Sequence, residues 1–338
     1  MRSTSTSTSP PPKSRPESRC RPPWASSFRR APSILTILLA ATQRPVSFAE
    51  AGRFCGRAGA GSGAHYSRQK SKTASPLFNH LRRRRAGAHS TQPFPTMNIG
   101  IIGAGHIGSA LAVRLTSLGH SVYIANSRGP ETLKEVEQKT GAKAVTAEQA
   151  AQHGTDLIVV TIPLKNIPDL PKNLLASVPQ DTPIIDTSNY YPMLRDGQIP
   201  ELETGSLTES EWVQQHLGRP VVKVFNNIYA DHLQNKGVAA GTPGRISLPV
   251  ASDDSAAKQK VMQLVDELGF DAVDDGTLHE SWRQQPGTPS YGADLPADQL
   301  REHLASLGTE RTEAQHAEFK ANHARTEQAM ADQGIKLK

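Results

Sequence analysis

Cysteine is scarce in this sequence: the 338 residues contain two, Cys20 and Cys55. From residue 97 onward there is none, so that part of the chain can form no disulfide and offers neither a thiol nucleophile nor a cysteine ligand for a metal. It also lacks a nucleophile elbow and a zinc motif. We therefore predict no catalytic side chain and no metal ligand, and we expect a bound cofactor to supply any redox chemistry.

Acidic residues are almost absent from residues 1–96, which hold 17 Lys and Arg against two Asp and Glu. The remainder of the chain holds 21 basic and 30 acidic residues. The excess of positive charge therefore belongs to the first part, and we expect no nucleic-acid partner for the rest. The apolar run of residues 34–41 is far too short to cross a bilayer, so we expect no membrane partner either.

Residues 1–96 are rich in Ser, Pro, Gly and Arg and show no sustained periodicity, which predicts a disordered basic leader. Abundant Arg and Ser with few acids is typical of a mitochondrial transit peptide. Alternatively, Met97 is the true start and the leader comes from an over-extended gene model. We expect a cytoplasmic protein, or a mitochondrial one if the leader is translated.

The most informative segment is MNIGIIGAGHIGSALA, residues 97–112. It predicts a buried strand, a turn of the form Gly103-x-Gly105-x-x-Gly108, and a helix that begins near His106 or Ile107. The first glycine permits the tight turn, the second lets the backbone approach a pyrophosphate, and the third allows close helix–strand packing. The unpaired N–H groups of the helix start would then bind phosphate. We interpret the segment as a dinucleotide site, the alternative being a structural glycine turn.

After the second predicted strand the chain reads Asn126-Ser127-Arg128. An acidic residue at this point would bind the adenosine ribose of NAD and repel a 2′-phosphate. A hydroxyl and a guanidinium instead suit the 2′-phosphate of NADP(H), because Arg offers charge and a planar fork of donors. Lys134 is a weaker candidate for added positive charge. The alternative is an ordinary solvated arginine in a turn.

From residue 97 onward, apolar runs alternate with helical patterns, which predicts an α/β fold with a doubly wound parallel sheet, the Rossmann arrangement. We expect strands at residues 98–103, 121–125, 143–145, 157–161, 183–186 and 221–225. We expect helices at 107–118, 130–140, 147–152, 167–176 and 209–217. A small α/β C-terminal extension follows, with strands at 245–251 and 271–274 around a helix at 254–268 that Asp253 or Asp254 caps.

Two polar helices, at residues 297–307 and 310–331, close the predicted fold. Their apolar faces are thin, so we expect the second to be a surface arm or a dimer contact. The chain thus divides into a leader (1–96), an NADP-binding Rossmann domain (97–230), an α/β extension (231–308) and a polar C-terminal helix (309–338). We expect a homodimer that acts on a small-molecule substrate.

Ligands in open α/β sheets lie outside the carboxyl ends of the strands, where this sequence places several polar segments. Thr161, Ile162 and Pro163 follow the fourth strand and should border the nicotinamide ribose and ring. Asn226 and Asn227 follow the sixth strand. Their amides could bind a carboxamide or an electron-accepting ring, or they are merely turn residues.

These motifs, together with PVASDD at residues 249–254, resemble the F420-dependent NADP oxidoreductase family, whose fold is also the first domain of pyrroline-5-carboxylate reductases. The resemblance covers residues 97–307 and implies hydride transfer between NADP(H) and a deazaflavin coenzyme. It also implies roles for particular residues. The pyrophosphate would be wrapped by Ala104, Gly105, His106 and Ile107, and the 2′-phosphate would be held by Ser127 and Arg128. Ile162 and Pro163 would flank the nicotinamide. The acceptor side would be lined by Asn226, Asn227 and Ile228.

We therefore expect an NADP(H)-dependent oxidoreductase whose acceptor is a deazaflavin, a flavin, a quinone or a small imine or carbonyl compound. A reductase of the pyrroline-5-carboxylate type is disfavoured, because too few residues follow residue 307 to form the long helical domain of those enzymes. The alternative from another class is a non-catalytic protein that binds NADPH and signals to a partner. Turnover of NADPH discriminates between the two.

Overall fold

The computed structural model of the chain describes residues 95–337. The predicted leader and its role in targeting therefore lie outside the described residues, apart from residues 95 and 96. Within the described part, no helix is long and apolar enough to cross a membrane. The division of the chain at residues 230 and 308 stays a prediction.

A six-stranded parallel sheet forms the first part of the fold, with strand order β3-β2-β1-β4-β5-β6. This order is that of a doubly wound nucleotide-binding sheet, so the predicted fold class is confirmed. The strands agree with the sequence prediction to within two residues at each end: β1 (Asn98–Ile102), β2 (Ser121–Ala125), β3 (Lys143–Ala144), β4 (Leu157–Val160), β5 (Ile184–Asp186) and β6 (Val222–Lys223).

Alternate side chains of the central strands pack into two separate hydrophobic clusters. Ile99 and Ile101 of β1 belong to one cluster, and Ile102 belongs to the other. Since neighbouring side chains of a strand point to opposite faces, the two clusters cover the two faces of the sheet. Both faces are therefore buried, as the continuous apolar composition of these strands requires.

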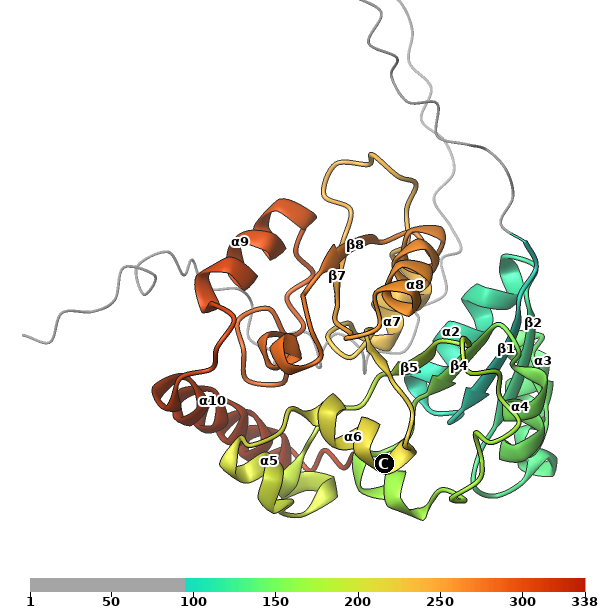
Figure 1. The fold of residues 1–338 in the computed structure, drawn as a ribbon, viewed down its shortest axis with the longest axis horizontal. Coiled ribbons are helices and arrows are strands. Elements are labelled where there is room, and N and C mark those ends of the chain that lie inside the picture. Colours follow the sequence, from blue (N-terminus) through green and yellow to red (C-terminus); the bar gives the residue numbers. More distant parts are fainter. Residues whose placement is uncertain (1–94, 338) are drawn as a thin grey trace, which may run out of the picture. The chain divides into compact units, whose positions relative to one another are not determined.

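Three helical segments accompany strands β1 to β4 and were predicted from the sequence: α2 (His106–Ser117), η2 with α3 (Pro130–Leu133 and Lys134–Thr140) and α4 (Ala147–His153). A capping box fixes the start of α4, because the Thr146 hydroxyl accepts from the backbone N–H of Gln149 while the Gln149 side chain accepts from that of Thr146. Figure 1 shows α2 and α4 beside β1 and β4.

The helix predicted at residues 167–176 is wrong. The structure has a short 3₁₀ segment, η3 (Leu164–Asp169), and then only turns as far as residue 178. Pro168 and Pro171 explain the difference, because each lacks the N–H group that an α-helix needs and clashes with the preceding turn. Leu164, Ile167 and Leu174 have the spacing of a helix and are buried, but the backbone between them is not a regular helix.

The chain between β5 and β7 contains α6 (Glu209–Leu217), which was predicted, and three short elements that were not: η4 (Pro192–Asp196), α5 (Pro200–Thr204) and α7 (Ala230–Asn235). Each of the three is only five or six residues long, too short to produce a clear helical period in the sequence. They matter for function because η4 and α7 border the cavity described below.

The C-terminal extension contains a second, two-stranded parallel sheet, β7 (Ser247–Val250) with β8 (Asp271–Asp274), connected by α8 (Ser255–Glu267). Asp254 caps α8, since its carboxylate accepts from the N–H groups of Ala256 and Ala257. An isolated antiparallel bridge between Lys223 of β6 and Ala251 joins the two sheets. The predicted extension is therefore confirmed. The short η5 (His279–Gln284) and then α9 (Ala297–Leu307) follow it.

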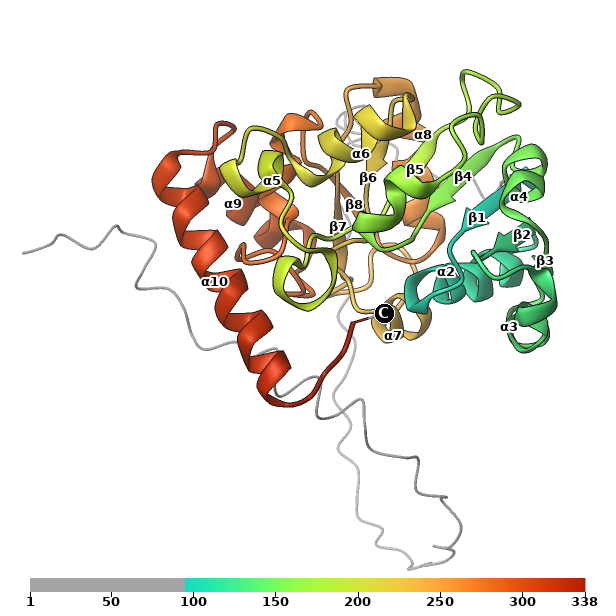
Figure 2. The same cartoon turned by 90° about the horizontal axis from the view of Figure 1, so that it is seen from below.

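The last helix, α10 (Glu313–Asp332), packs against the body of the protein, contrary to the expected surface arm. Phe319 and Met330 are buried, and the Phe319 ring lies 6.2 Å from that of Trp282 in η5. Buried polar side chains, His323 and Glu327, complete this face, which is why the sequence shows only a thin apolar stripe. After α10 the chain reverses its direction (Figure 2).

Candidate functional site

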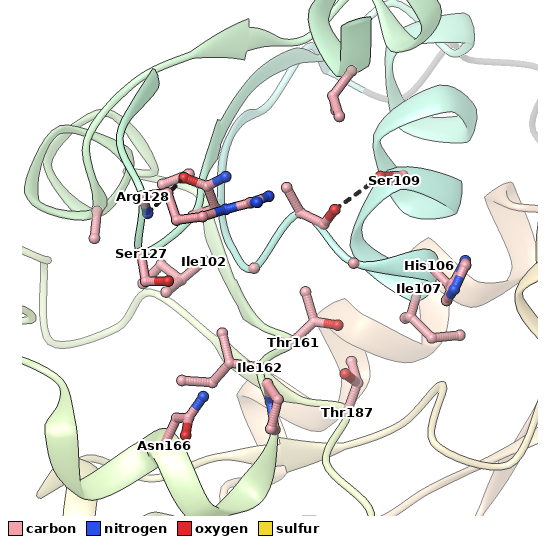
Figure 3. Close-up of a pocket in the computed structure, with 18 of the residues that line it drawn as sticks. Ile102, His106, Ile107, Ser109, Ser127, Arg128, Thr161, Ile162, Asn166 and Thr187 are labelled. Carbon is pink, nitrogen blue, oxygen red and sulfur yellow. Dashed lines mark hydrogen bonds between the residues drawn. The ribbon is translucent and has the colours of Figure 1, made fainter. Parts of the chain in front are cut away.

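A cavity of about 1520 Å³ lies at the carboxyl ends of β1, β2, β4 and β5. Figure 3 shows Arg128 and Ser127 on one side of it and His106 and Ile107 on the other, with Thr161 and Ile162 between them. The lining includes the predicted Gly103, Ala104, Gly105, His106, Ile107, Ser127, Arg128, Thr161, Ile162 and Pro163. The structure thus brings ten of the twelve predicted site residues together, at the edge where open α/β sheets bind ligands.

The glycine turn has the geometry that its sequence predicts. Gly103 has φ = 122°, and a Cβ atom there would lie 2.1 Å from the carbonyl oxygen of Thr161. A Cβ atom at Gly108 would lie 2.0 Å from the carbonyl oxygen of Gly103. At Gly105 a Cβ atom would meet nothing within 4 Å, so this position opens onto the cavity. Two glycines therefore allow close packing, and the third leaves room for a ligand.

The helix α2 starts at this turn, and no side chain caps it. Its N-cap is Gly105, and its first turn contains no acidic residue. Uncapped N–H groups and the positive end of the helix dipole together favour a bound anion such as a phosphate. The start of α2 is thus suited to a pyrophosphate.

Beyond β2, Ser127 and Arg128 are exposed and line the cavity. Asn126 fixes their turn, because its side-chain oxygen accepts from the backbone N–H of Arg128 (3.0 Å) and its amide donates to the Thr132 hydroxyl (2.9 Å). Within residues 95–337, no carboxylate pairs with the Arg128 guanidinium. Lys139 of α3 also lines the cavity, whereas Lys134 does not.

Asn226 is buried behind the cavity and is not among its lining residues. Its amide nitrogen donates to the side-chain oxygen of Asn189 (3.2 Å) and to the carbonyl oxygen of Gln284 (2.8 Å). The preceding residue, Phe225, has φ = 63°, a strained conformation for a bulky side chain. Such strain is often found at functional sites.

The sequence did not identify two tyrosines at this end of the cavity as a pair. Tyr191 lines the cavity, and its hydroxyl lies 2.6 Å from the hydroxyl of Tyr291. Burial raises the pKa of Tyr191 to about 12, although the hydrogen bond with Tyr291 and the charge of Arg195 oppose the shift. Tyr191 is therefore protonated at neutral pH. Its place after the fifth strand was a signal, but nothing local indicates a partner 100 residues away.

A buried cluster of charged side chains contacts the segment after β5 that carries Tyr191. Lys223 is completely buried, with its ammonium 3.5 Å from the Asp186 carboxylate and 3.3 Å from that of Glu209. The ammonium also donates to the carbonyl oxygen of Ser188, which lines the cavity. The hydroxyl groups of Ser188 and Ser210 donate to Asp186. Through the carbonyl oxygen of Ser188, this cluster fixes the backbone shortly before Tyr191.

No group of three or more His, Cys, Asp or Glu side chains is arranged to hold a metal ion within the described part of the chain. The cavity lining combines backbone, hydroxyl, amide and cationic groups with apolar side chains and with the carboxylates of Glu135, Glu148, Asp169 and Asp231. Such a set can bind phosphates and position an aromatic ring.

Residues 98–190 match the family described as NADP oxidoreductase, coenzyme F420-dependent. Among solved structures, the hypothetical protein SMa0349 from Sinorhizobium meliloti is 32% identical in sequence. The match covers 60% of this chain and 96% of that one, with a TM-score of 0.50. The part of the chain that is similar thus includes the whole of the cavity's glycine turn and the ends of strands β1 to β5.

Two curated proteins are also similar to parts of the chain. The protein YjhV of Escherichia coli (strain K12) is 53% identical over 57 residues, which are 17% of this chain and 42% of that protein. The glycerol-3-phosphate dehydrogenase (NAD(P)+) of Clostridium botulinum (strain Eklund 17B / Type B) is 25% identical over 147 residues, 40% of this chain and 42% of that enzyme. The chain therefore spans less than half the length of either curated relative.

Proposed function

The chain belongs to the NADP oxidoreductase, coenzyme F420-dependent family and carries its NAD(P)-binding Rossmann domain, and from this we propose that it is an NADP(H)-dependent oxidoreductase. The reaction is direct hydride transfer between NADPH and a small acceptor such as a deazaflavin or a flavin. The observation that carries the proposal is the glycine turn at the uncapped start of α2. It opens onto a large cavity next to Arg128, which pairs with no carboxylate among residues 95–337.

The residues present suit NADP(H). The turn from Gly103 to Ile107 would hold the pyrophosphate at the start of α2. Ser127 and Arg128 would bind the 2′-phosphate, with Lys139 adding positive charge, and Thr161, Ile162 and Pro163 would flank the nicotinamide. When bound, the cofactor supplies the hydride, and the protein positions it and shapes the cavity around it.

The size of the cavity supports a second ligand beside the cofactor. Its volume of about 1520 Å³ exceeds the roughly 300–1,000 Å³ of a typical site for one small molecule. The additional lining comes from Thr187, Ser188, Asn189 and Tyr191, which follow β5. We place the hydride acceptor there.

The expected homodimer and cytoplasmic location belong to the same proposal. Sedimentation tests the oligomeric state, and cell fractionation tests the location.

The test measures whether the full chain catalyses the oxidation of NADPH by an added acceptor. The absorbance of NADPH at 340 nm monitors the reaction. The panel of acceptors holds coenzyme F420, FMN, FAD, a quinone and pyrroline-5-carboxylate. We expect one acceptor to oxidise NADPH rapidly, and NADH to react more slowly with the same acceptor. Tight binding of NADPH without oxidation by any acceptor would contradict the proposal and favour a protein that binds the nucleotide and signals.

A further inference from the structure

A chain of four side chains leads from the protein interior to the acceptor end of the cavity. The Asn226 amide donates to the side-chain oxygen of Asn189 (3.2 Å), and the Asn189 amide donates to the hydroxyl of Tyr291 (3.2 Å). The hydroxyl of Tyr291 lies 2.6 Å from that of Tyr191, which lines the cavity.

These contacts give the chain a direction. The side-chain oxygen of Asn189 accepts from Asn226, so the Asn189 nitrogen, which can only donate, faces Tyr291. With its oxygen already accepting from Asn189, Tyr291 can donate its own hydrogen to the oxygen of Tyr191. Either hydroxyl can donate in this bond, and where Tyr291 donates, the hydrogen of Tyr191 is free to point away from the pair. In agreement, the hydrogen bond between the tyrosines lowers the pKa of Tyr191 and raises that of Tyr291.

Other groups at this end of the cavity are less suitable as proton donors. The Ser188 hydroxyl donates to Asp186 (2.5 Å). The Arg195 guanidinium donates to both oxygens of Asp196 (2.9 Å each), and arginine does not give up its proton in proteins. A phenol is also a much stronger acid than the hydroxyl groups of Ser and Thr. Tyr191 is therefore the most suitable proton donor of these groups. It is more acidic than the Ser and Thr hydroxyls, it lines the cavity, and its hydrogen is not taken up by a carboxylate.

Burial keeps Tyr191 protonated, while the charge of Arg195 opposes the rise in its pKa. Arg195 lies 5.2 Å from the Tyr191 ring centroid and the His323 ring 5.1 Å from it. Tyr229 and Glu209 act on it at longer range, and both raise its pKa.

We propose that Tyr191 is the proton donor of the reaction and that Tyr291 restores its proton, an inference that rests on the proposed function. The acceptor is then a molecule whose reduced form gains a proton on nitrogen or oxygen, such as an imine, a carbonyl compound or a flavin-like ring. Asn226 acts as a positioning residue: it orients Asn189 and, through it, Tyr291.

Hydride from the cofactor forms the new bond to the acceptor, which is reduced while the cofactor is oxidised. The O–H bond of Tyr191 breaks as its proton moves to the acceptor atom that takes up the displaced electron pair. The Tyr191 oxyanion takes a proton from Tyr291, and Tyr291 takes one from water.

The test compares Tyr191→Phe, Tyr291→Phe and the matched control Tyr190→Phe. Tyr190 is the neighbouring residue, but its hydroxyl donates to Glu203 and accepts from the N–H of Ile199, and it does not line the cavity. With whichever panel acceptor the wild type reduces, Tyr191→Phe should lower the rate of hydride transfer by about 10²- to 10⁴-fold, the usual worth of a positioned general acid. Tyr291→Phe should have a smaller effect, and Tyr190→Phe none.

A second acceptor separates proton donation from structural damage. An N-alkylated nicotinamide cation takes up hydride without a further proton, so Tyr191→Phe should spare its reduction. Equal loss with both acceptors would overturn the inference, as would an unchanged rate in Tyr191→Phe, and either would leave the proposed oxidoreductase intact. If the wild type reduces no acceptor, the proposed function itself fails and the inference with it.

A readout without turnover tests the hydrogen-bond chain. In protein labelled with ¹³C at the tyrosine ring carbon that bears oxygen, the Tyr191 resonance is identified by its loss in Tyr191→Phe. It should shift in Tyr291→Phe and remain in place in Tyr190→Phe. A Tyr191 resonance that does not respond to removal of the Tyr291 hydroxyl would contradict the pair.

Discussion

The two ends of the cavity, which we propose to bind the nucleotide and the hydride acceptor, are built in different ways. At the nucleotide end, the glycine turn, Ser127 and Arg128 come from short loops directly after β1 and β2, and their polar groups face solvent. At the acceptor end, Asn189 and Tyr191 rest on buried polar side chains that come from β5, β6, α6 and the C-terminal extension.

Each end of the cavity obtains its precise geometry from a different source. The nucleotide end depends on backbone shape, which a local motif can specify by itself. The acceptor end depends on side chains fixed by hydrogen bonds across 37 to 102 residues of sequence. We therefore expect substitutions at the acceptor end to disturb folding, and substitutions at the nucleotide end to disturb mainly ligand binding.

The largest effect should come from Lys223→Met. Without the ammonium, the buried carboxylates of Asp186 and Glu209 lose their only close cation among the described residues. Breaking a buried ion pair in this way costs about 3–5 kcal/mol. Denaturant unfolding measures the loss of stability.

Lys139→Met is the matched control at the nucleotide end, where the side chain is exposed. It should change stability by no more than about 0.5 kcal/mol. If the two lysine variants were equally stable, the contrast between the two ends would be wrong.

The next effect separates two glycines of one motif. Gly108→Ala forces a Cβ atom to within 2.0 Å of a backbone oxygen, and such overpacking costs about 1–3 kcal/mol of folding stability. In Gly105→Ala the added Cβ atom enters open space, and the φ of −76° suits any residue, so the variant should fold normally. It should bind both NADPH and NADH more weakly, because the methyl group occupies the space proposed for the pyrophosphate. Thermal unfolding and nucleotide titration of both variants measure this. A Gly105→Ala protein that bound both nucleotides as the wild type does would place the pyrophosphate elsewhere.

The smallest effect concerns the extension. Asp254→Ala removes the cap of α8, where the carboxylate accepts two N–H groups at 3.0 Å each. The loss should be about 1 kcal/mol, with nucleotide affinity unchanged, because Asp254 does not line the cavity. Asp298→Ala, in the first turn of α9, is the control, since no side chain caps that helix. Equal unfolding midpoints for the two variants would contradict the assigned cap.

The sequence was sufficient for the sheet and the nucleotide end because their signals are local. Continuous apolar strands predicted β1 and β4, and the spacing of three glycines predicted the turn and the start of α2. The helix predicted at residues 167–176 is absent because Pro168 and Pro171 interrupt it, although the apolar spacing is that of a helix.

The acceptor end could not be predicted because its contacts are long-range. Nothing near Tyr191 in the sequence indicates Tyr291, and nothing near Lys223 indicates that it is buried between Asp186 and Glu209. The sequence predicted Asn226 as a cofactor-binding residue that lines the acceptor side. Its side chain contacts Asn189 and Gln284 rather than the cavity, an arrangement that depends on the folded extension.

The most direct test of the account is calorimetric titration of NADPH and NADH into the wild type and Arg128→Ala. We expect the wild type to prefer NADPH. Loss of the arginine should cost about 1.5–3 kcal/mol of NADPH affinity, the usual worth of hydrogen bonds to a charged group. NADH affinity should barely change, since that nucleotide has no 2′-phosphate. Equal weakening of both nucleotides, or a wild type that prefers NADH, would contradict the assignment of Ser127 and Arg128 to the 2′-phosphate.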